Sequence, residues 1–170
     1  APYPATEPVK GYAPGSEEKE SLLAKYKEMY NQEPIDVPMY IGSEEVTTND
    51  KRKMSPPHDH SHNLGSYNFG TKEHVTKAID AALAAKSDWA NMPWENRASI
   101  FLKAADLLEG PFRDELNAST MLAQSKNAMQ AEIDAACELI DFFRFNVAFM
   151  QQVYEDQPES NPGMWNRLEY

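Results

Sequence analysis

The segment 58–62 holds the densest group of side chains that could bind a metal ion. Its three histidines, His58, His60 and His62, stand at alternate positions. In a β-strand this alternation would place the three imidazoles on one face, an arrangement that suits zinc or copper. The two prolines before the segment indicate instead a turn, in which the alternation is not enforced. The residues therefore leave a metal site and an ordinary turn open, and the turn is favoured.

A second pattern, residues 65–72 (GSYNFGTK), is similar to a phosphate-binding loop because two glycines stand just before a predicted helix. Such a loop needs Lys directly after the second glycine, followed by Ser or Thr. Here Thr71 precedes Lys72, so neither the ammonium nor the hydroxyl group would reach a phosphate. We expect Thr71 to be the N-cap of the next helix and no nucleotide to bind here.

The single cysteine, Cys137, lies within a predicted helix on an apolar stripe, with no histidine nearby in the sequence. A nucleophilic cysteine needs solvent access and a lowered pKa, so we predict a packing role for it. Glu132 and Asp134 occupy the first turns of the same helix. They could complement the positive end of the helix dipole, or present a carboxylate at the mouth of a pocket to a cationic group.

The composition limits the classes of partner. The 170 residues carry a net charge of −11, with 41% hydrophobic residues and one cysteine. Binding to nucleic acid or to an anionic membrane requires clustered Lys and Arg, so we expect no nucleic acid partner. No apolar run approaches the roughly 20 residues of a spanning helix, so we expect no membrane insertion. One cysteine also excludes an internal disulfide framework.

Proline and glycine divide the chain into three predicted regions. Residues 1–70 form an extended N-terminal region with one helix, starting after Ser16 and ending near Asn31, and a β-hairpin over residues 37–48. Further extended pieces are predicted at 51–55 and 64–69. Residues 71–157 form a helical bundle, and residues 158–170 a linker. The predicted helices of the bundle start at Thr71, at Pro93, after Gly110-Pro111 and after Asn127, where Gln130 suggests a capping box.

The last predicted helix, roughly residues 128–154, is apolar on two adjacent stripes. One stripe consists of Met129, Ile133, Ala136, Ile140, Phe143, Val147 and Met150, and the other of Ala135, Leu139, Phe142, Phe149 and Val153. So wide an apolar surface predicts burial on more than one side. The three preceding helices can cover one face. We therefore expect the chain to be a piece of a larger body.

Three long motifs, residues 97–108 (RASIFLKAADLL), 130–136 (QAEIDAA) and 138–146 (ELIDFFRFN), closely resemble the mitochondrial delta-1-pyrroline-5-carboxylate dehydrogenase branch of the aldehyde dehydrogenase superfamily. The similarity extends from residues 40–42 (YIG) to 166–170 (NRLEY). It implies an α/β fold in the full-length protein, of which this part is mainly α-helical with an N-terminal hairpin and lacks the Rossmann core.

The resemblance also implies a function. The full-length protein would oxidise L-glutamate gamma-semialdehyde to L-glutamate with NAD, in proline catabolism in the mitochondrial matrix, as a homo-oligomer. The family's catalytic Cys and Glu and its NAD-binding core would follow residue 170, so this part would hold no catalytic, cofactor or metal residue. One position is carried over: Glu132 would border the substrate tunnel and bind the substrate's α-ammonium group.

The alternative hypothesis is a truncated, non-catalytic relative that serves as a structural subunit of a mitochondrial assembly. A third and weaker one is a metal-binding module built on the three histidines.

Overall fold

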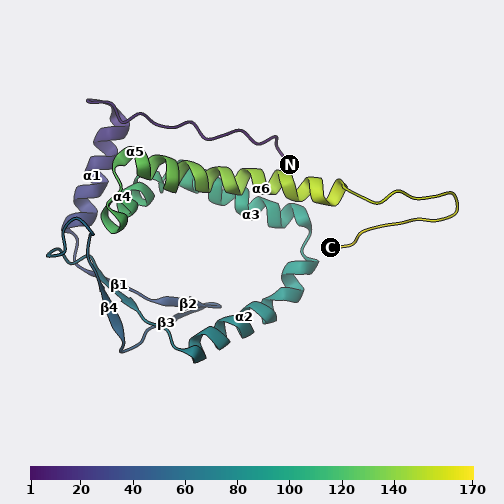
Figure 1. The fold of residues 1–170 in the computed structure, drawn as a ribbon, viewed down its shortest axis with the longest axis horizontal. Coiled ribbons are helices and arrows are strands. Elements are labelled where there is room, and N and C mark those ends of the chain that lie inside the picture. The colour runs from purple at the N-terminus through teal and green to yellow at the C-terminus, as the bar shows by residue number, and fades with distance from the viewer.

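A computed structural model describes all residues 1–170. The helical elements are α1 (Glu17–Asn31), α2 (Lys72–Asn91), α3 (Trp94–Glu109), α4 (Arg113–Gln124), α5 (Ala128–Ala131), η1 (Glu132–Cys137) and α6 (Glu138–Glu155). The strands are β1 (Ile35–Val37), β2 (Met39–Ile41), β3 (Glu44–Val46), β4 (Lys51–Met54) and β5 (Gly65–Asn68). Figure 1 shows α1, the strands, α2 and the α3–α6 pair following one another around an open ring.

The predicted helix starts are confirmed, and side-chain hydrogen bonds explain them. The hydroxyl of Ser16 accepts a bond from the backbone N–H of Lys19, at 3.4 Å. Asn127 and Gln130 form the predicted capping box, each side chain accepting from the other's backbone N–H at 2.9 and 3.0 Å. Thr71 is the N-cap of α2. These bonds satisfy backbone donors that the first helical turn leaves free.

The strands form two small sheets. β2 and β3 make the predicted antiparallel hairpin, with Gly42 at a φ of +62° in the turn. β1 is separate from that hairpin: it pairs in parallel with β5, and β4 pairs with the other edge of β5, giving the order β1-β5-β4. The sequence predicted the extended pieces that form β4 and β5, whereas the pairing of β1 depends on a partner 30 residues away, as between Ile35 and Gly65.

The predicted continuous helix 128–154 is corrected in one respect: a π-turn, η1, interrupts it. The N–H of Glu138 donates to the carbonyl of Ile133, five residues back. In an α-helix, residues five apart are rotated by about 140° about the axis. The π-turn brings Glu132 and Cys137 onto one side, where both contact Arg113.

The chain buries little of its apolar surface: 19 of 170 residues are buried. α1 packs on α4 around Tyr12, Leu22 and Ala118, and α6 packs on α3. No residue of α2 is buried. The division at residue 70 stays a prediction, although the α1–α4 contact joins the first two regions. Among the helices, none combines the length and apolar character that crossing a lipid bilayer requires.

Both ends of the chain are extended. Residues 1–12, which we call the N-terminal strap, run along α6 (Figure 1), and the Ala1 ammonium donates to the side chain of Gln151 at 2.7 Å. Residues 156–170 contain no helix or strand and loop away from the helices before returning (Figure 1). The return brings the ring of Tyr170 against that of Tyr154, with 5.4 Å between centroids.

We expect Gly65→Ala to lower the free energy of unfolding by at least about 2 kcal/mol. Gly65 has a φ of +141°, and a Cβ there would lie 2.7 Å from the backbone nitrogen of Ile35. Chemical denaturation measures the change. Gly11→Ala is the control, because a Cβ at Gly11 would meet nothing within 4 Å. Equal stabilities of the two variants would contradict the prediction.

Candidate functional site

Glu132, predicted to bind substrate, is fully buried at the start of η1. Its Oε2 accepts hydrogen bonds from the hydroxyl of Tyr12 at 2.5 Å and the amide of Asn117 at 2.8 Å. Its Oε1 accepts from the guanidinium of Arg113 and from the backbone N–H of Lys10 at 3.1 Å. Both oxygens are thus occupied by groups of this chain.

Arg113 links Glu132 to the N-terminal strap. Its Nη1 donates to Glu7 at 2.5 Å, and its Nη2 also donates to the carbonyl of Pro8 at 3.0 Å. Glu7 in turn accepts from Arg144 of α6 at 2.6 Å. We call Glu7, Tyr12, Arg113, Asn117 and Glu132 the buried ion cluster. It ties the strap to α4, η1 and α6.

The surroundings of Glu132 keep its carboxyl group ionised. Burial would raise the pKa of Glu132, but hydrogen bonds from Arg113, Tyr12 and the Lys10 N–H outweigh it and lower the pKa to about 2. Burial and the bond to Glu132 raise the pKa of Tyr12. Glu132 is therefore a carboxylate and Tyr12 a neutral phenol near neutral pH. A substrate ammonium would have to displace an existing donor from Glu132, whose substrate-binding role stays a prediction.

The predicted burial of Cys137 is confirmed: the residue is 5% exposed. Burial and the negative charge of Glu132 raise the pKa of its thiol to about 11. The thiol is therefore protonated at neutral pH and lacks the properties of a nucleophile.

The three histidines do not converge on a common point. Residues 58–62 form the turn that the prolines indicated, with backbone bonds from Asp59 to Pro56 and from His62 to Asp59. The ring of His62 stacks on Tyr30 with 3.8 Å between centroids, and His58 Nδ1 lies 2.7 Å from the hydroxyl of Ser125. No group of three His, Cys, Asp or Glu side chains is placed to hold a metal ion.

The glycines of segment 65–72 do not fit the pyrophosphate of NAD. Gly65 packs against the backbone of Ile35, and a Cβ at Gly70 would lie 3.1 Å from the sulfur of Met39. The space that these glycines leave is filled by the chain itself, so they form no cradle for a pyrophosphate. That this segment binds no nucleotide stays a prediction.

An open apolar groove of about 290 Å³ runs along the solvent-facing side of α6. Its lining residues are Glu138, Asp141, Phe142, Phe145, Asn146 and Phe149. The ring of Phe142 is 60% exposed and that of Phe149 50%, so the second apolar stripe of the helix is largely uncovered. Glu138 is the exposed carboxylate at this groove, in contrast to the buried Glu132.

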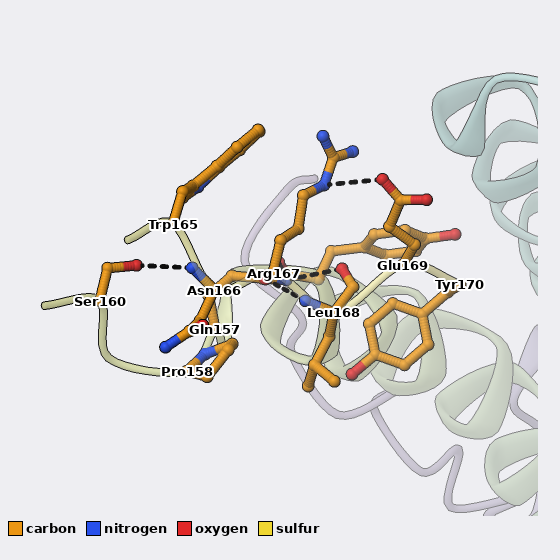
Figure 2. A pocket seen from close by; sticks show the side chains of 10 residues that line it. Gln157, Pro158, Ser160, Trp165, Asn166, Arg167, Leu168, Glu169 and Tyr170 are labelled. Atoms are coloured by element: carbon orange, nitrogen blue, oxygen red, sulfur yellow. Dashed lines mark hydrogen bonds and ion pairs between the residues drawn. The ribbon is translucent and has the colours of Figure 1, made fainter. Parts of the chain in front are cut away.

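Another hollow, of about 560 Å³, lies within the C-terminal segment. Figure 2 shows that groups around it are already paired: Arg167 with Glu169, and the backbone N–H of Asn166 with the hydroxyl of Ser160. The hollow is formed by a single loop and Tyr154, and it contains none of the candidate site residues that the sequence analysis named.

Sequence reasoning missed most of the cluster and also missed Glu138. Arg113 could have been noticed, because a cation at the first position of a helix opposes the dipole and needs a specific partner. Glu138 could have been noticed as a charge beside the second apolar stripe, four residues before Phe142. No comparable sequence signal singles out Glu7 or Tyr12 within the proline-rich strap.

We expect Glu132→Gln to lower stability at pH 7 by about 3 kcal/mol, because Arg113 loses a buried counter-charge. The unfolded carboxyl titrates near pH 4.3, and the folded one near 2. Its stabilisation is therefore complete above about pH 4.3 and is lost as the pH falls towards 2. Chemical denaturation between pH 7 and pH 2 measures this effect. The free energy of unfolding of the variant should fall less steeply with decreasing pH than that of the wild type.

Asp134→Asn is the control for this substitution, since Asp134 forms only an exposed pair with Lys126. If the free energies of unfolding of the wild type and of Glu132→Gln fall in parallel with decreasing pH, Glu132 is not the carboxylate that stabilises the fold in this pH range.

Comparison with known proteins identifies the chain's relatives. A model described as "Aldehyde dehydrogenase family" matches residues 45–170. Delta-1-pyrroline-5-carboxylate dehydrogenase of Agaricus bisporus is 51% identical over 99% of this chain, and the mitochondrial enzyme of that name from Bos taurus is 44% identical over 98%. The chain spans 31% and 29% of these relatives, about a third of their length.

Solved structures of similar fold lead to the same family as the sequence comparison. The delta-pyrroline-5-carboxylate dehydrogenase of Mycobacterium tuberculosis, solved with NAD and cobalamin, matches the whole chain at a TM-score of 0.95 and 48% identity, over 32% of its own length. The Thermus thermophilus enzyme matches 96% of the chain at 0.85 and 26% identity, over 31% of its length. The fold and the sequence thus lead to one conclusion: the chain belongs to the aldehyde dehydrogenase family.

Proposed function

We propose that this chain is the N-terminal part of an NAD-dependent dehydrogenase that oxidises L-glutamate gamma-semialdehyde to L-glutamate in proline catabolism. The observation that carries the proposal is the 51% identity to a delta-1-pyrroline-5-carboxylate dehydrogenase over 99% of the chain. The relatives named above are all called dehydrogenases, so the alternative of a non-catalytic structural subunit gains no support from them.

Within that enzyme the chain's role would be to form a wall and not to perform the chemistry. The exposed apolar faces of α2 and of the C-terminal end of α6 support this role: Ile79 and Leu83 are 54% and 61% exposed, and Val153 is 48% exposed. Burial of such surfaces contributes roughly 25 cal/mol per Å², so a larger body has reason to cover them. We propose that an α/β core packs there and binds NAD, for which the residues of this chain do not form a site.

The groove on α6 is the part of this wall best suited to a small amino-acid aldehyde. Its phenylalanines offer an apolar surface to the methylene chain, and Glu138 and Asp141 offer negative charge to an α-ammonium group. Asp141 already accepts a bond from the backbone N–H of Glu7, whereas no bond is formed by the carboxylate of Glu138 within the chain. We propose Glu138 as the carboxylate that faces the substrate.

The location and assembly are parts of the same proposal. The Bos taurus relative is named mitochondrial. We propose the mitochondrial matrix and a homo-oligomer for the complete protein.

The complete protein should reduce NAD when given L-glutamate gamma-semialdehyde, with glutamate as the product, whereas residues 1–170 alone should not. NADH absorbance together with chromatographic detection of glutamate tests both statements. A complete protein that oxidises other aldehydes but not this one would contradict the proposed substrate.

In the complete protein, Glu138→Gln should raise the KM for the semialdehyde by about tenfold through loss of one ion pair, with little change in stability. Glu132→Ala tests the earlier prediction in the same assay. A KM left unchanged by Glu132→Ala would remove Glu132 from the substrate site, and one left unchanged by Glu138→Gln would remove Glu138.

A further inference from the structure

The groove on α6 combines aromatic rings with negative charge. Its six lining residues are Glu138, Asp141, Phe142, Phe145, Asn146 and Phe149. Asp141 and Phe142 follow Glu138 by three and four residues, so the three side chains lie on one face of the helix. The rings of Phe145 and Phe149 continue that face, with 6.1 Å between their centroids. The groove is therefore acidic at one end and aromatic along its length.

No cation lines the groove, because Lys, Arg and His are all missing from its lining. Arg144 is the one basic residue of α6, and it lies outside that lining. Its guanidinium is already paired with Glu7 and Glu109, each at 2.6 Å. The carboxylate of Glu138 forms no ion pair within the chain. The negative charge of the groove is thus left for a ligand to neutralise.

An amino acid meets this charge in two opposing ways. In L-glutamate gamma-semialdehyde the ammonium and the carboxylate are bonded to the same carbon atom. A position at which Glu138 attracts the ammonium is therefore also one at which it repels the carboxylate. Asn146 is the only side chain of the lining that carries an N–H donor, and it stands eight residues after Glu138, roughly 12 Å further along the helix axis. The groove thus offers a partner to the ammonium and none nearby to the carboxylate.

The molecule 4-aminobutanal is this semialdehyde without its carboxylate. In both compounds three carbon atoms separate the nitrogen from the aldehyde carbon. The ammonium of 4-aminobutanal can pair with Glu138 and lie against the ring of Phe142, which attracts a cation through its π-electrons. Its methylene groups can contact the remaining rings as those of the semialdehyde would. The attraction is retained and the repulsion is removed.

We propose that the complete enzyme also oxidises ω-aminoaldehydes that lack an α-carboxylate, and that the α6 groove binds their ammonium group. In this reaction the aldehyde carbon loses a hydride to NAD and gains the oxygen of a water molecule. From 4-aminobutanal the products are 4-aminobutanoate, NADH and two protons. The inference rests on the proposed function, since it requires that the groove faces the reacting aldehyde.

The test compares 4-aminobutanal with butanal in the complete enzyme by NADH absorbance. The two aldehydes share one carbon chain and differ only in the ammonium group. Rates are expressed per open-chain aldehyde, because the amine partly cyclises to an imine. We expect kcat/KM to be about tenfold higher for 4-aminobutanal, as one ion pair at the groove implies. E138Q preserves the shape of the side chain and should lower this ratio to below about threefold.

D141N provides a second measurement. Asparagine keeps an oxygen that can accept the bond from the backbone N–H of Glu7, and it removes the charge, so the ratio should fall here too. E33Q is the matched control, because Glu33 is exposed between α1 and β1 and lies outside the groove lining. This control should keep the ratio within about twofold of wild type.

Equal kcat/KM values for 4-aminobutanal and butanal in the wild-type enzyme would overturn the inference. A ratio that both E138Q and D141N leave unchanged would overturn it as well, because the preference would then arise elsewhere. Neither result affects the oxidation of L-glutamate gamma-semialdehyde. An enzyme that oxidises 4-aminobutanal but not the semialdehyde would overturn the proposed function instead.

Discussion

The ion pair between Arg113 and Glu132 is the constraint on which the rest of this structure depends. Both side chains are almost completely removed from water, at 2% and 0% exposure. Burying two charges is costly unless each finds its partner with good geometry and additional hydrogen bonds. Tyr12, Asn117 and the backbone of Lys10 supply those bonds for Glu132, and Glu7 completes the shell of Arg113. Segments more than 100 residues apart in sequence must therefore meet at one point.

The same constraint accounts for the irregular helix. Glu132 and Cys137 both face Arg113, while α6 packs on α3 along its length. A regular α-helix cannot satisfy both contacts, because five residues do not return to the same face. The π-turn of η1 takes up the additional residue. The helix that bears the open groove is thus held at its start by charge and along its length by apolar packing.

Local signals predicted the elements well. Ser16, Thr71 and Asn127 cap helices because their side chains compete for the free N–H groups of the first turn, an interaction within four residues. The hairpin followed from Gly42 and its flanking strands. The parallel pairing of β1 with β5 and the exposure of α2 could not be predicted in this way, because both depend on residues distant in the sequence.

The sequence by itself determined where the helices start, the burial of Cys137 and the family membership that three long motifs suggest. It also showed that the last helix is too apolar to be covered by its neighbours. Only the tertiary structure decided which carboxylate is buried and which is free: Glu132 is enclosed by the strap and α4, whereas Glu138, six residues on, faces the groove. The reason is physical. The position of a residue in a helix fixes the direction in which its side chain leaves the helix axis. The groups that this side chain contacts depend on which segments, distant in the sequence, pack against that side of the helix.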